Sequence, residues 1–345
     1  MADTGHNLII DVPGLRVGNA DDASAATGVT VVVFDEPAVA SLAIMGGGPG
    51  VRDTALLEPE MTVQTVDAIV LSGGSAFGLD AAGGAMSALA RHGRGFEVGS
   101  ARVPIVPQAV LFDLINGGSK PWAAGDGIPP YRALAEAAVE NALAAQGAFP
   151  LGTHGAGFGA TTVNLKGGLG SASARTPEGH WVGALVAVNA VGSAVIGDGP
   201  HFWAAPYERD GEFGGLGLPA SIPAKALIPR FKGGPNENTT IAIVATDAAL
   251  TKAQAKRLAL AAHDGMARAL RPAHALLDGD LIFAASTGRR PLGPSPYELS
   301  TLGLAAADVL ARAIARGIHT ATALPYAGSL PGWQAIFNTN NLKNI

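Results

Sequence analysis

The sequence predicts an α/β fold in which two β-sheets pack together and are covered by helices. Short apolar runs rich in β-branched residues recur between glycine-rich turns, and they are continuous rather than alternating, as in strands buried on both faces. Helical patterns lie before and after these runs, which favours a layered arrangement. The 345 residues include 47 Gly and 23 Pro, yet 48% are hydrophobic, which excludes a disordered chain and indicates many close-packed turns.

Six apolar runs are expected to be strands: residues 28–34, 66–71, 182–188, 190–196, 240–245 and 281–285. Two of them belong to the longest apolar stretch, Val182–Gly197, which Asn189 and Ser193 interrupt. This stretch is also shorter than the roughly 20 residues that a bilayer requires. We therefore expect a buried strand pair there, and no membrane partner.

Four segments are expected to be helices: residues 76–92, 131–146, 251–270 and 297–316. Ser75 follows two glycines and is expected to cap the first helix. Pro129 and Pro130 precede the second, where proline is a favoured entry residue. Thr251 and Gln254 have the spacing of a capping box at the start of the third.

The composition limits the chemistry. The chain has no Cys, which excludes a disulfide framework, a thiolate nucleophile and cysteine zinc sites. Its eight His residues include no pair four apart with an intervening Glu, so a metal site is not expected. A net charge of -5 and only 6% aromatic residues do not favour nucleic-acid binding, which usually needs a basic surface. The start of the chain does not read as a secretory signal, so we expect a cytoplasmic protein that acts on a small molecule or peptide.

Three glycine-rich segments invite a nucleotide or nucleophile-elbow interpretation, and each departs from it. Gly46–Gly50 lacks the Gly-Lys-Ser/Thr ending of a phosphate loop, and Lys166–Gly170 places its Lys before the glycines. Gly73–Phe77 has Phe where a nucleophile elbow needs its second Gly. Nucleotide binding is therefore not expected.

Residues 208–235 form a Gly-, Pro- and charge-rich stretch without a clear period. Such a stretch is either an exposed linker or a functional, mobile segment. It runs into the strand that begins at Thr239. A Thr at a strand start commonly reflects β-propensity alone. Alternatively, Thr239 could attack the preceding carbonyl, shift the acyl group from nitrogen to oxygen, and free an amine that serves as its own base.

The sequence around Thr239 and several other motifs resembles the DmpA-type self-cleaving aminopeptidases, whose branches include the 6-aminohexanoate-oligomer (nylon oligomer) hydrolases. The matches run in order from about residue 10 to 325. They are Thr27–Thr30, Gly46–Gly50, Leu71–Ala82, Lys166–Ser171, Asn238–Ile241, Val244–Asp247 and Asp278–Asp280.

The resemblance implies a four-layer α/β/β/α sandwich of the DmpA/ornithine-acetyltransferase (Ntn-hydrolase-like) type, formed by residues 1–345 as a single amidohydrolase domain. It also implies cleavage between Asn238 and Thr239 into a large chain, 1–238, and a small chain of 107 residues, 345 minus 238. A homotetramer of such pairs and no metal or organic cofactor are implied as well.

By the same resemblance, Thr239 is the nucleophile, and Lys166 and Asn189 are polar partners of its hydroxyl and of the oxyanion. Asp278 and Asp280 would orient the Thr239 amine and Lys166. Without the resemblance, Lys166 reads as a surface lysine, Asn189 as a structural hydrogen-bonding residue, and Asp278–Asp280 as a plain turn.

Departures from the family bear on the substrate. The branch with a Ser nucleophile has Ser-x-Glu where this chain has Asp278–Asp280, and a Tyr near Leu111 or Phe112. The site therefore resembles that of the Thr branch more closely, and Tyr131 is a candidate aromatic residue lining the substrate site. We expect short linear amides, either amino-terminal peptide residues or 6-aminohexanoate oligomers.

Two other functions fit the same fold. The first is an ornithine-acetyltransferase-like acyl transfer, but that family's nucleophile follows a Lys-Gly-containing motif and Glu237–Asn238 stands here. The second is an unprocessed, non-enzymatic binding protein, for which an intact full-length mass would be the sign.

Overall fold

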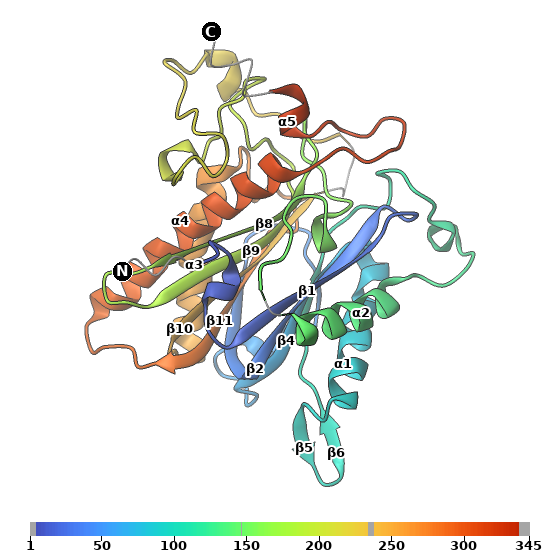
Figure 1. Ribbon diagram of the computed structural model, residues 1–345, viewed down its shortest axis with the longest axis vertical. Helices are drawn as coiled ribbons and strands as arrows, with labels where there is room; N and C mark the ends of the chain where they lie inside the picture. The colour runs from blue at the N-terminus through green and yellow to red at the C-terminus, as the bar shows by residue number, and fades with distance from the viewer. Residues whose placement is uncertain (1–4, 146, 234–237, 338–345) are drawn as a thin grey trace.

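The computed structural model describes residues 5–145, 147–233 and 238–337. Within these residues, nine strands are hydrogen-bonded in the order β3-β7-β4-β2-β11-β10-β9-β8, with β1 paired to β2. The strands are β1 (Leu15–Asp22), β2 (Thr27–Ile44), β3 (Gly50–Arg52), β4 (Thr65–Ser72), β7 (Gln108–Val110), β8 (Gly168–Arg175), β9 (Trp181–Asn189), β10 (Thr239–Ala248) and β11 (Leu281–Arg290). Strands β5 (Phe96–Val98) and β6 (Ala101–Val103) form a separate hairpin, which projects at the bottom of Figure 1.

Strand β2 is long enough to belong to two half-sheets. Its first part pairs with β1 and β4, at Val29↔Ser72 for example. Its last part pairs with β11, from Val39↔Ser286 to Ile44↔Leu281. The two sheets expected from the sequence are therefore two halves of one hydrogen-bonded path.

Three hydrophobic cores separate four layers, because side chains alternate between the faces of each strand. Even-numbered residues of β9–β11 pack against α3 (Lys252–Ala269) and α4 (Pro296–Thr320), and their odd-numbered neighbours fill the core between the half-sheets. Odd-numbered residues of β2 pack against α1 (Ala81–Arg91) and α2 (Tyr131–Ala144). In Figure 1 these two helix pairs lie on opposite sides of the strands. The predicted α/β/β/α layering is confirmed.

The helices agree with the sequence in position, with one correction at a cap. Thr251 and Gln254 form the predicted capping box, with the Thr251 amide donating to Gln254 Oε1 at 2.8 Å. Ser75 is not a helix cap. Gly74 occupies that position without a side-chain hydrogen bond, and residues 75–80 form a 3-10 helix before α1. A last short helix, α5, covers Trp333–Ile336.

The strand predicted at residues 190–196 is absent, although this segment is part of the structure. Strand β9 ends at Asn189, and the backbone groups beyond it bond outside the sheet. Ser193 exchanges two hydrogen bonds of 3.0 Å with Arg271, and Val195 bridges to Phe202. Apolar composition thus predicted burial correctly but not the direction of the backbone.

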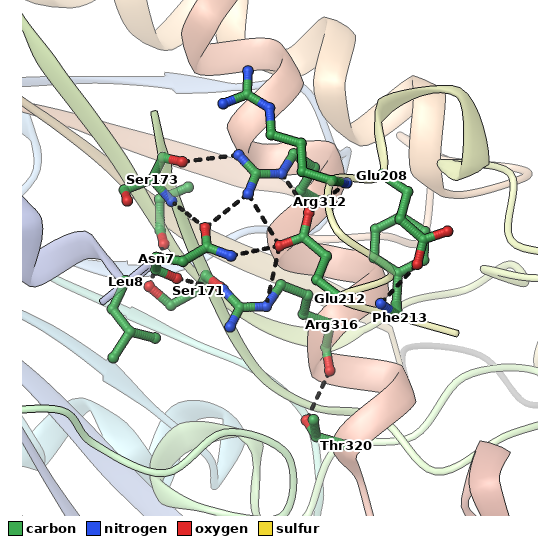
Figure 2. Close-up of polar contacts among 12 residues, drawn as sticks. Asn7, Leu8, Ser171, Ser173, Glu208, Glu212, Phe213, Arg312, Arg316 and Thr320 are labelled. Carbon is green, nitrogen blue, oxygen red and sulfur yellow. Dashed lines mark hydrogen bonds and ion pairs between the residues drawn. The ribbon is translucent and has the colours of Figure 1, made fainter. Parts of the chain in front are cut away.

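The Gly- and Pro-rich stretch from residue 208 is attached to α4 at its beginning. Glu212 lies between Arg312 and Arg316, with Arg312 Nε 2.5 Å from Glu212 Oε1 (Figure 2). Asn7 donates to Glu212 Oε2 at 2.6 Å and accepts from Arg312 at 2.7 Å. Phe213 follows and packs its ring at 5.3 Å from Phe202. We call residues 208–213 the anchor.

No helix of the described residues has the length and apolar character to span a membrane.

Candidate active site

Thr239 is the first residue of β10 and is 5% exposed. It lies opposite Asn189 in the antiparallel pairing with β9, and both residues continue the rows of side chains that face the central core. The Thr239 hydroxyl donates to the carbonyl oxygen of Asn238, the residue that precedes it. The amide of Gly279 donates to the same carbonyl at 3.2 Å. A hydroxyl and an amide donor thus meet at the Asn238–Thr239 peptide bond.

The glycine motif at residues 46–50 supports the segment that carries Gly279. Gly46 donates to the carbonyl of Asp280 at 3.0 Å, and Gly48 to that of Asp278 at 2.8 Å. A Cβ atom on Gly46 would lie 2.3 Å from the Asp278 carbonyl oxygen, and one on Gly279 would lie 2.6 Å from Thr239 Oγ1. Gly46 is thus required for the close approach of two backbones, and Gly279 for the close approach of the Thr239 hydroxyl.

The two carboxylates predicted for the site are buried beside this peptide bond and differ in charge. Asp280 Oδ1 accepts from the amide of Thr240 at 2.8 Å, and its Oδ2 accepts from the amide and the ring of His274 at 2.9 and 3.0 Å. Burial alone would raise the pKa of Asp280, but the hydrogen bonds from His274 and from the side chain of Asp278 hold it below its usual value. Burial and the neighbouring Asp280 raise the pKa of Asp278. The pair therefore shares one negative charge, located on Asp280.

Lys166 is fully buried, which excludes the surface-lysine interpretation. Its ammonium donates to the carbonyls of Gly157, Ala160 and Gly167 at 3.1, 2.8 and 2.8 Å. Burial lowers the pKa of Lys166 to about 7, against the attraction of buried Asp113. The expected contact between Lys166 and the Asp278–Asp280 pair is not found, because these carbonyls take its three donors.

Asn189 connects Thr239 to the Lys166 side of the site. Its Oδ1 accepts from the Thr161 amide at 3.0 Å and from Lys232 Nζ at 2.9 Å, and its Nδ2 donates to the Phe112 carbonyl at 3.0 Å. Lys232 belongs to the Gly- and Pro-rich stretch, six residues before Asn238. The amide of Asn189 is thus held by loops on both sides.

Two pockets adjoin at Phe112. One, of about 280 Å³, contains Thr239 and is lined mainly by small and apolar residues. The other, of about 210 Å³, contains Asp113, Lys166 and Lys232. Tyr131 lines neither pocket. It is fully buried in the core between the helices α1 and α2 and the strands β2 and β4, with its ring centroid 6.3 Å from that of Trp122. The structure therefore places the predicted aromatic wall away from Thr239.

Four groups near the predicted residues were not anticipated: the Gly279 amide, Asp113, Lys232 and His274. Lys232 is one of several charges in the stretch of residues 208–235, and Asp113 lies one residue beyond Leu111 and Phe112, near which the Ser branch has a Tyr. Gly279 was visible only as the spacer between two Asp residues. Nothing in the local sequence marks His274.

Comparison with known proteins identifies the family. The model of Peptidase family S58 matches residues 7–329. The chain belongs to this family. It is 43% identical to an uncharacterized aminopeptidase of Mycobacterium tuberculosis, over 96% of this chain and 98% of that protein. It is 28% identical to a 6-aminohexanoate-oligomer endohydrolase of Kocuria sp., over 84% and 77%.

Solved structures share the fold of this family member. A β-aminopeptidase of Burkholderia sp. superposes with a TM-score of 0.69 at 21% identity, covering 99% of this chain and 95% of that one. An L-aminopeptidase D-Ala-esterase/amidase of Ochrobactrum anthropi, described as a variant of the Ntn-hydrolase fold, gives 0.67 at 20% identity and the same coverage. As a member of a peptidase family with this fold, the chain is a hydrolase of amide bonds.

Proposed function

We propose that the protein is an amidohydrolase that cleaves itself between Asn238 and Thr239 and then uses Thr239 as its nucleophile. The observation that carries the proposal is the hydroxyl of Thr239 against the carbonyl of Asn238, with the Gly279 amide on the same oxygen. A nucleophile and an oxyanion donor on one peptide bond are what an acyl shift needs.

Self-cleavage would proceed in two steps, an acyl shift and the hydrolysis of the resulting ester. The Oγ1 atom of Thr239 attacks the carbonyl carbon of Asn238, and negative charge develops on the oxygen that the Gly279 amide contacts. The C–N bond breaks as the nitrogen takes up the hydroxyl proton, leaving an ester. The Thr239 amine is free from this point, and water then hydrolyses the ester, which releases the Asn238 carboxylate and restores the Thr239 hydroxyl.

Turnover would repeat this chemistry on a substrate. The neutral Thr239 amine accepts the hydroxyl proton, Oγ1 attacks the amide carbonyl, and the departing amine takes that proton. Water hydrolyses the acyl-enzyme to a carboxylic acid. In this proposal Asp280 holds the amide that follows the nucleophile, Asp278 lies beside it, and Asn189 and Lys166 border the far side of the site.

The pocket at Thr239 favours a short linear substrate. Its volume of about 280 Å³ suits a short chain, and its lining combines glycines and apolar side chains with the polar groups of Ser75, Asn238 and Thr239. We therefore propose amino-terminal peptide residues or 6-aminohexanoate oligomers as substrates. We also propose a homotetramer of processed pairs, which the native mass would test.

Intact mass spectrometry under denaturing conditions tests the proposal directly. The wild type should give two fragments that meet at Asn238 and Thr239. The variant Thr239→Ala should remain a single folded chain without activity toward either an aminoacyl p-nitroanilide or a linear 6-aminohexanoate trimer. Thr239→Ser should retain part of the processing because it keeps a hydroxyl. Splitting of Thr239→Ala at the same bond would refute the mechanism.

A further inference from the structure

His274 lies beside the candidate site but belongs to neither the strands nor the motifs that suggested it. Its backbone φ is +57°, in the left-handed region that residues other than Gly adopt uncommonly, with Asn, Asp and His the most frequent exceptions. Its amide and its ring Nδ1 both reach the same oxygen, Asp280 Oδ2. A residue in this uncommon conformation that makes two hydrogen bonds to a single buried carboxylate oxygen indicates a function.

The bonds of His274 act through Asp280 on the nucleophile. The second oxygen of Asp280 accepts from the Thr240 amide, one residue after Thr239. Asp280 is 0% exposed, so these protein N–H groups take the place of water around its charge. Loss of the ring donor would move negative charge toward Asp278, whose Oδ1 accepts from the Gly279 amide at 3.0 Å. That amide is also the one that contacts the Asn238 carbonyl.

We propose that His274 is a positioning residue for the reaction of Thr239: its imidazole fixes Asp280 as the charged member of the aspartate pair and orients it on the backbone of the nucleophile strand. This inference rests on the proposed function. Because Asp280 as an anion can only accept, the ring proton lies on Nδ1 in this role.

The surroundings of His274 make the inference testable by chemical rescue. Its side chain is 19% exposed and lines a pocket of about 270 Å³ with Trp203, Arg271 and Pro272. A small molecule can therefore reach the position of the ring. His263, on α3, lies edge-on to it with ring centroids 4.8 Å apart, but its Nε2 contacts the Ala43 carbonyl and not Asp280.

The experiment compares three variants of the full chain with and without added imidazole. His274→Gly suits the left-handed backbone and removes only the ring. His274→Asn also tolerates this backbone, and its side-chain amide can donate to Asp280. His263→Ala is the matched control, because it removes a neighbouring buried imidazole and leaves the Asp280 contacts in place. The readouts are the rate of chain splitting by intact mass and kcat per processed chain.

His274→Gly should split and turn over about tenfold to a hundredfold more slowly, the effect of losing one hydrogen bond to a charged group. Added imidazole should restore part of the rate in His274→Gly but not in His263→Ala, and His274→Asn should exceed His274→Gly. Wild-type rates in His274→Gly, or a loss that neither imidazole nor Asn reduces, would overturn the inference. If the wild type itself does not split at Asn238, the proposed function fails instead, so the two failures are distinguishable.

Discussion

At the residue scale, burial decides which charges the candidate site holds. Asp280 receives three N–H donors and stays ionised, whereas Asp278 receives one from Gly279 and lies next to that charge. Two carboxylates this close cannot both ionise without a cation bonded to them. Asp278 is therefore protonated near neutral pH, although the two residues look equivalent in the sequence.

This asymmetry predicts different effects of the same substitution. Asp278→Asn replaces a neutral acid by a neutral amide of similar shape and should keep the splitting rate within about tenfold of wild type. Asp280→Asn removes the charge that accepts from Thr240 and His274, and should slow splitting by a further factor of about ten to a hundred. Time courses of intact mass for the two variants measure both rates. Equal losses would contradict a single charge on Asp280.

Lys166 predicts a specific pH dependence. Its three carbonyl partners favour the ammonium, yet burial lowers its pKa to about 7. If turnover needs this ammonium, its deprotonation around pH 7 lowers activity, while deprotonation of the Thr239 amine, with an ordinary pKa of about 7.7 to 8.0, increases activity. The activity maximum therefore lies between these two pKa values. The profile should be a narrow bell whose limbs belong to the coupled groups.

The pH profile of amide hydrolysis in wild type and Lys166→Met checks this expectation. The methionine keeps most of the buried volume and cannot carry a charge, so the falling limb should vanish while the rising limb remains. An unchanged falling limb in Lys166→Met would remove Lys166 from the mechanism.

At the element scale, the anchor fixes the start of the Gly- and Pro-rich stretch to α4, so that cleavage at Asn238 would free the later part of the stretch and not its start. Glu212 bonds to Arg312 and Arg316 of α4, which belongs to the proposed small chain. The anchor would therefore keep the large chain attached to the small chain after cleavage, and only residues beyond Phe213 would gain freedom. Two of them, Arg230 and Lys232, now contact Asp198 and Asn189.

Removal of the anchor charge should destabilise the protein. Glu212→Gln leaves Arg312, 2% exposed, without its carboxylate and should lower the free energy of unfolding by about 3 kcal/mol. Glu136→Gln is the control, because its pair with Arg91 is exposed and should contribute less than about 1 kcal/mol. Urea unfolding of both variants measures the difference, and equal midpoints would show that the anchor contributes nothing.

The contribution of this ion pair to folding stability should depend on pH. Burial raises the pKa of Glu212, but bonds from Arg312 and Asn7 and the charge of Arg316 outweigh it and hold the pKa below 4.5. A depressed carboxylate pKa stabilises the fold above the unfolded value and loses this effect as pH falls through the folded value. The gap in stability between wild type and Glu212→Gln should therefore be full at pH 7 and shrink below about pH 4.5.

At the scale of the whole molecule, the two proposed chains are interleaved in one sheet. Strands β10 and β11 follow Thr239, and they lie between β9 and β2, which precede it. Helices α3 and α4 cover both sets of strands. Cleavage would thus cut the backbone without separating a folding unit, because the cores on both faces of β10 contain residues from both chains.

After cleavage, the two fragments should consequently remain associated and unfold together. The 238-residue and 107-residue fragments should co-elute in size exclusion at neutral pH and appear together in native mass spectrometry. They should separate only in denaturant, in a single cooperative transition. A free small chain without denaturant would contradict this picture.

The layering, the five buried strands β2, β4, β9, β10 and β11, and the main helices follow from the sequence by itself, because apolar periodicity and start signals are local properties. The other strands, β1, β3 and β5 to β8, were not predicted. Thr239, Lys166, Asn189 and the Asp278–Asp280 pair were also chosen from the sequence, through motifs that resemble a family. The run at residues 190–196 and the cap at Ser75 were misjudged, since apolar composition does not specify where backbone hydrogen bonds go.

Only the tertiary structure decided how these residues are charged and what they contact. The opposition of Asn189 and Thr239 depends on strand register, and the contact of His274 with Asp280 depends on a left-handed turn. Lys166 faces three carbonyls instead of the aspartates because the chain that carries it folds back on residues 157–160. Burial and hydrogen-bond partners arise between segments far apart in the chain, so no local pattern encodes them.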